Sequence, residues 1–135
     1  MRTGRGLAIA AIAVMLMSAV LGGVVSAHHS RAGYDAKKTV TLNGVVKEVV
    51  WRNPHVYILF GVKDDKGNVV QWTGELSSIA TMLAAGMSKD SLKAGDEIVV
   101  IGAPAEAGTP QSLIAKLSKA DGTVVVADSY RSDTR

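Results

Sequence analysis

The order of short apolar runs along the chain is the feature that most limits how it can fold. Runs rich in Val, Ile and Thr, bounded by Gly, Pro, Asn or Asp, are typical of β-strands. One segment differs, because Ile79, Met82 and Leu83 follow the spacing of a helix. Ser77 and Gly86 would cap its two ends, which gives a helix of about nine residues. The predicted strands lie at residues 39–51, 55–62, 69–76, 97–103 and 112–118, with a short extra strand at 124–127.

Three strands, a short helix and two further strands form the order of the OB-fold, a small Greek-key barrel. Gly44, Gly74 and Gly102 fall inside predicted strands, where a small barrel needs its strands to coil tightly. A plain antiparallel sheet with one helix is the alternative. The sequence therefore predicts an all-β domain with one short helix, a five-stranded OB-fold-like barrel preceded by a signal peptide.

The start of the chain has the layout of a secretory signal peptide. A basic leader is followed by an uncharged apolar run from Leu7 to Val25 and then by the small residues Ser26 and Ala27. We expect cleavage after Ala27 and a periplasmic or secreted protein. The run is also long enough for an uncleaved membrane anchor, which stays an alternative. The predicted organisation is a signal peptide at 1–27, an N-terminal arm at 28–38, the barrel at 39–127 and a polar tail at 128–135.

Charge and cysteine content exclude several classes of function. The chain has 15 basic and 12 acidic residues, and the leader holds two of the basic ones, which leaves 13 basic against 12 acidic residues. A nearly neutral chain with mixed charges has no basic surface for nucleic acid, so we expect no nucleic-acid partner. The chain has no cysteine, which excludes disulfides, thiol catalysis, thiolate-bound zinc, iron–sulfur clusters and thioether-linked haem.

The three histidines, His28, His29 and His55, are the candidate metal ligands. Cleavage after Ala27 would make His28 the first residue, and its amine and imidazole nitrogens could then chelate Cu(II). A third nitrogen from His29 or His55 would complete a T-shaped site. The alternative is a disordered arm, because chain ends are usually mobile.

The ligand face of OB barrels lies on strands two and three, between the loops that join strands one to two and four to five. These loops correspond to residues 51–54 and 104–111, and His55 directly follows the first. Alternation along the strand places His55 opposite Val56, on the same face as Tyr57. The alternative for His55 is a half-exposed strand residue that hydrogen-bonds across the turn.

The predicted ligand face also includes Trp51, Asn53 and Trp72 beside Tyr57. The two tryptophans could form an aromatic platform for a ring-shaped ligand. Alternatively, Trp72 fills the core, Trp51 caps the barrel end, and Asn53 serves the turn that Pro54 completes. In the arm, Tyr34 is expected to act as an anchor.

Several stretches resemble one family of short exported bacterial proteins that is known only as a domain of unknown function. They are "HHS", "YDAKKTVTLNGVV", "VVWRNPHVYI", "DDKGNVVQW", "LKAGD" and "ADG", and they span nearly all of residues 28–126. The family is marked by HHS near the mature start and by a W-x-N-P-H corner. The resemblance implies a periplasmic location and an OB-like barrel, but no activity. It matches His28, His29, Ser30, Trp51, Asn53, Pro54 and His55, whereas Tyr34 stands where a phenylalanine is expected.

No motif of an enzyme is present, since there is no phosphate-binding glycine loop, no HExxH and no spaced Ser, His and Asp set. We therefore expect a non-enzymatic periplasmic binding module for a metal ion, Cu(II) first, or for a small ligand. The alternatives are an accessory subunit that docks on a membrane or periplasmic protein complex, and an OB barrel that binds a small ligand or oligosaccharide.

Overall fold

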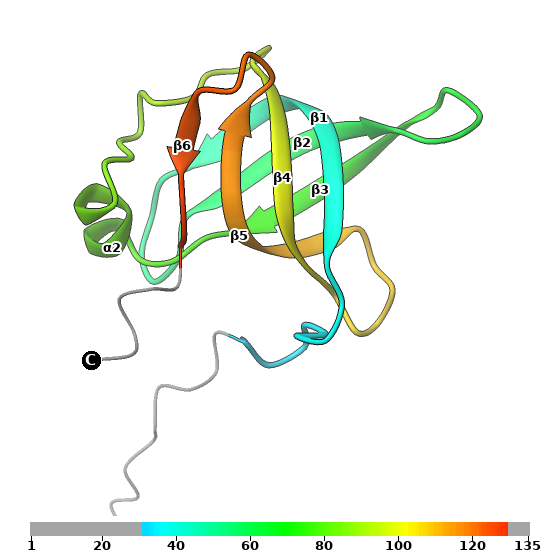
Figure 1. Ribbon diagram of the computed structural model, residues 1–135, viewed down its shortest axis with the longest axis horizontal. Coiled ribbons are helices and arrows are strands. Elements are labelled where there is room, and N and C mark those ends of the chain that lie inside the picture. Colours follow the sequence, from blue (N-terminus) through cyan, green and yellow to red (C-terminus); the bar gives the residue numbers. More distant parts are fainter. Residues whose placement is uncertain (1–30, 130–135) are drawn as a thin grey trace, which may run out of the picture. The chain divides into compact units, whose positions relative to one another are not determined.

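The computed structural model describes residues 31–129. The predicted signal peptide, its cleavage site, His28 and His29 lie outside these residues. The described part of the chain forms a mostly β domain with one short helix (Figure 1). Its elements are β1 (Val40–Val50), β2 (Tyr57–Lys63), β3 (Val69–Glu75), α2 (Ile79–Ala84), β4 (Glu97–Pro104), β5 (Gln111–Lys119) and β6 (Val124–Val126).

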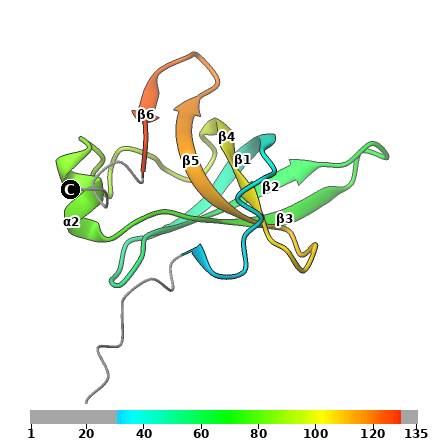
Figure 2. The same ribbon diagram turned by 60° about the horizontal axis from the view of Figure 1, so that its bottom comes forward.

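The sheet closes into a barrel. Its strand order is β3-β2-β1-β4-β5-β6, and β3 also pairs with β5. This last pairing is parallel and short, from Thr73 opposite Gln111 to Glu75 opposite Leu113, whereas every other strand pair is antiparallel. The OB-fold-like five-stranded barrel is thereby confirmed, and the plain sheet is not formed. Strand β6 adds to the outside of β5, and the β2–β3 hairpin projects beyond the barrel (Figure 2).

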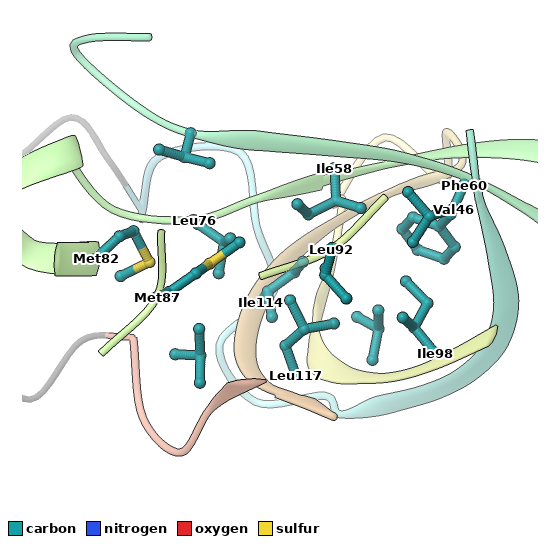
Figure 3. Close-up of a cluster of buried hydrophobic side chains, with 13 residues drawn as sticks. Val46, Ile58, Phe60, Leu76, Met82, Met87, Leu92, Ile98, Ile114 and Leu117 are labelled. Carbon is teal, nitrogen blue, oxygen red and sulfur yellow. The ribbon is translucent and has the colours of Figure 1, made fainter. Parts of the chain in front are cut away.

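The core follows the two-residue period of the strands. Val56, Ile58 and Phe60 are fully buried, as the alternation along β2 predicts. The core extends from Phe60 and Val46 to Met82 and the loop residue Met87 (Figure 3). Its buried members are Val46, Val56, Ile58, Phe60, Leu76, Met82, Met87, Leu92, Ile98, Val100, Ile114, Leu117 and Val126. The packed region continues to Ser129, which is buried and whose amide donates to the Ala115 carbonyl at 3.0 Å.

The three glycines predicted to permit tight coiling, Gly44, Gly74 and Gly102, all lie where neighbouring atoms leave no room for a side chain. A Cβ at Gly44 would come within 2.7 Å of the Phe60 ring. A Cβ at Gly102 would clash with the carbonyl oxygen of Leu113 on β5, next to the irregular β4–β5 register between Ile101 and Gly102. The prediction that strand glycines permit tight coiling is consistent with this close approach.

The helix is shorter than predicted, and its N-cap is Ser78 and not Ser77. The Ser78 hydroxyl accepts from the Thr81 amide at 3.2 Å, and α2 spans six residues. Gly86 ends the helix as expected, with φ +87°, and the Met87 amide returns to the Met82 carbonyl at 2.9 Å. Leu83 is 55% exposed, so only Met82 is buried from the helix. Ser77 cannot cap, because its carbonyl accepts from Val56 and extends the β2–β3 pairing by one step. Within residues 31–129, no helix is long and apolar enough to cross a membrane.

Replacing Gly102 by alanine should lower the free energy of unfolding by roughly 1–3 kcal/mol, because its neighbour at β5 is backbone and cannot turn away. Gly61→Ala is the matched control, since the only close atom there is a methyl of Val69, which is 67% exposed. This control should change stability by no more than about 0.5 kcal/mol. Urea unfolding of both variants measures the difference, and equal stability would contradict the close approach at Gly102.

Candidate functional site

The corner between β1 and β2 is fixed to the start of the helix. The Asn53 side-chain oxygen accepts from the Ile79 amide at 3.4 Å, and the Asn53-Pro54 peptide bond is cis. Directly after the corner, the Val56 amide donates to the Ser77 carbonyl at 3.0 Å, and the Leu76 amide donates to Val56 at 2.8 Å. His55 is therefore held between a bonded corner and a paired strand, on the outer face of the barrel.

Glu75 is the partner of His55. One carboxylate oxygen, Oε1, contacts the imidazole Nδ1, and the exposed fractions of the side chains are 23% for His55 and 12% for Glu75. Tyr57 stands directly opposite Glu75 in the β2–β3 register, so His55, two residues earlier, is its diagonal neighbour on the same face. A carboxylate can only accept hydrogen bonds, so Nδ1 carries the proton and Nε2 is the nitrogen left for a ligand or metal.

The second oxygen of Glu75 binds the arm. The Tyr34 hydroxyl donates to Oε2 at 2.8 Å, across 41 residues of sequence. The arm also pairs with the loop between β4 and β5, which lies beside it in Figure 1, through a bridge between Tyr34 and Ala105. Two backbone bonds flank the bridge, from the Asp35 amide to Pro104 at 2.9 Å and from the Glu106 amide to Gly33 at 2.8 Å. Tyr34 is thus confirmed as the anchor of the arm.

Both tyrosines of this face resist ionisation. Burial, and then the hydrogen bond to Glu75, raise the pKa of the Tyr34 hydroxyl well above its ordinary value. Burial and the charge of Glu75 also raise the pKa of Tyr57, against the opposing effect of Arg52. The Arg52 guanidinium carbon lies 5.7 Å from the centre of the Tyr57 ring, which is a cation–π distance. The His55 and Tyr57 rings lie 6.5 Å apart between centroids.

The predicted ligand face is only partly assembled. Tyr57 lies beside His55, and Asn53 is engaged with the helix. Trp51 and Trp72 both pack against the core, and Trp72 stands opposite the buried Phe60 in the sheet register. Both tryptophans are half-buried, and Trp72 shares the face of Phe60, which is opposite to that of Tyr57.

Two residues of the site, Glu75 and Arg52, were not predicted, and neither was the bond of the expected anchor Tyr34 to Glu75. Glu75 is the central member of the site, and Arg52 contributes a positive charge. The strand pattern does indicate the position of Glu75. Pairing residues outward from the hairpin loop at 64–68 places Glu75 opposite Tyr57. The only indication of Tyr34 in the sequence is that it is an aromatic residue within a polar arm.

His55 is the one imidazole that the described residues can offer to a metal. Across residues 31–129 there is no group of three or more His, Cys, Asp or Glu side chains that could hold an ion. A shallow groove of about 420 Å³ lies elsewhere, at the Gly61–Lys63 end of β2, and His55 is not among its lining residues. A site of three such side chains that includes His55 would therefore need ligands from outside residues 31–129.

The raised pKa of Tyr34 predicts a specific loss of stability in alkali. The folded chain keeps this proton at a pH where the unfolded chain, with a tyrosine pKa of about 10, has lost it. The Tyr34 hydroxyl thus makes its full contribution to the free energy of unfolding at neutral pH, and this contribution is lost as the pH rises above about 10.

Tyrosinate absorbance against pH, with folding followed by circular dichroism, measures this effect. We expect Tyr34→Phe to remove a tyrosine whose pKa lies well above the ordinary value, and Glu75→Gln to lower the pKa of Tyr34. An unchanged titration curve in Tyr34→Phe would show that the hydroxyl is not held as described.

Comparison with known proteins places the chain in a family. A search of curated proteins finds no match. The profile of a family of unknown function, DUF6152, matches residues 15–114, which include the corner, His55, Glu75 and Tyr34. Because the match covers most of the chain, this protein belongs to that family of unknown function.

Proposed function

We propose that this protein is an exported, non-enzymatic binding module that takes up Cu(II) through His28, His29 and His55. In this proposal the leader is removed after Ala27, and the mature chain acts in the periplasm. The amine and imidazole of His28 form the chelate, and an imidazole from His29 or His55 adds the third nitrogen.

The observation that carries the proposal is the contact between Glu75 and Nδ1 of His55. Histidines that bind metals almost always give their other ring proton to a carboxylate or carbonyl, which fixes the tautomer and raises the basicity of the ligating nitrogen. Glu75 stands in this relation to His55, with Nε2 as the nitrogen that would bind the ion.

The position of the arm supports the same assignment. Tyr34 is bonded to the carboxylate that contacts His55, so the arm reaches the histidine. Tyr34 is the sixth residue after His28, and an extended chain of this length spans at most roughly 20 Å. The terminal histidines are consequently tethered to His55 at an effective concentration on the order of millimolar, which favours a shared site.

Copper titration of the mature protein tests the proposal. The mass of the exported chain first establishes whether it begins at His28. We expect His55→Ala, and separately one glycine added before His28, to lower the Cu(II) affinity at least about tenfold, because each change removes a ligand.

Matched controls separate these losses from general effects. Lys63→Ala alters the other end of β2, and one glycine added after Arg135 lengthens the chain without touching His28. Both should bind as the unaltered protein does. Equal copper affinity in His55→Ala, the glycine-extended chain and the controls would refute the proposed site.

A further inference from the structure

Glu75 divides its two oxygens between segments that are far apart in the sequence. Oε1 contacts His55, two residues before the start of β2, and Oε2 accepts from Tyr34 of the arm. The carboxylate is 12% exposed, so water satisfies little of it. One side chain, Glu75, therefore contacts both the corner, through His55, and the arm, through Tyr34.

Sharing a glutamate links the two contacts energetically. A glutamate side chain loses much rotamer freedom when it is fixed, and this loss occurs once, whichever bond forms first. The second donor then meets a carboxylate that is already oriented. Each contact consequently favours the other, even though His55 and Tyr34 have no direct bond in the described part of the chain.

The arm is an element that can open without unfolding the barrel. Besides the Tyr34 hydroxyl, it is held to the β4–β5 loop by the Tyr34–Ala105 bridge and by the backbone bonds of Asp35 and Glu106. Residues 31–33 and 36–39 are exposed. Segments with few buried contacts belong to the low-stability end of a protein and open locally.

We propose that Glu75 couples docking of the arm to the His55 site, with Tyr34 as a positioning residue and not a ligand. An open arm leaves Glu75 less ordered and so weakens its hold on Nδ1 of His55. The copper-dependent part of the inference rests on the proposed function: a metal ion on His55 would favour the docked arm, and a docked arm would favour the metal by the same factor. Without metal, loss of His55 would already loosen the arm.

Amide hydrogen exchange of the metal-free chain tests the coupling on its own. The amides of Asp35 and Glu106 make the bonds between arm and loop, so they report docking. We expect their exchange to become about fivefold faster or more in Tyr34→Phe and also in His55→Ala. Tyr57→Phe makes the same chemical change on the same face and should stay within about twofold.

Controls keep this test decisive. The Val46 amide, bonded to Asp96 at 2.9 Å, reports global unfolding in the same spectra. His55→Gln is the second variant if His55→Ala does not fold. Unchanged exchange at Asp35 and Glu106 in the folded His55 variant would overturn the coupling, whatever the protein binds.

The copper-dependent part of the inference is tested in a separate experiment. We expect Cu(II) to slow exchange at Asp35 and Tyr34→Phe to weaken Cu(II) binding by a similar factor, about fivefold or more. Binding of copper with no effect on the arm would overturn the inference while leaving the proposed function standing. If copper does not bind at all, the proposed function fails, and the metal-free exchange alone decides whether Glu75 couples arm and histidine.

Discussion

The need of one half-hidden carboxylate for hydrogen-bond donors organises this end of the molecule. Glu75 is 12% exposed, and a carboxylate so far removed from water is unfavourable unless donors surround it. The imidazole of His55 and the hydroxyl of Tyr34 are two such donors, from two separate segments that both precede Glu75 in the sequence. Because Tyr34 and His55 share this acceptor, the arm is held next to the histidine. Without Glu75, the corner and the arm would have no shared partner.

Barrel closure puts that carboxylate in place. Glu75 ends β3 at its short parallel contact with β5, and the β4–β5 loop, to which the arm is bonded, ends at Gln111, the first residue of that contact. Leu113, whose carbonyl oxygen lies against Gly102 of β4, is the β5 residue that stands opposite Glu75. The close approach of β4 and β5 at Gly102 thus adjoins the strand position that carries Glu75. The site belongs to the fold, and not to a loop added to it.

Sequence patterns predict the fold well and the site in part. The two-residue period of β2 identifies both its buried face and the outward position of His55. The helix cap was misplaced by one residue, because Ser77 and Ser78 are both good caps and strand pairing at Ser77 decides between them. Tyr34 could not be assigned to Glu75 in advance, since a contact across 41 residues from an arm without periodicity depends on tertiary packing.

The central claim is that Glu75 fixes the neutral imidazole of His55 with its proton on Nδ1, which leaves Nε2 able to accept a ligand. Nitrogen chemical shifts of the neutral His55 ring, measured by NMR, test this claim most directly. The account predicts that the neutral ring carries its proton on Nδ1 and none on Nε2. Rapid exchange between the Nδ1-H and Nε2-H tautomers should appear only in Glu75→Ala. A ring protonated on Nε2, or one that already exchanges freely beside an intact Glu75, would contradict it.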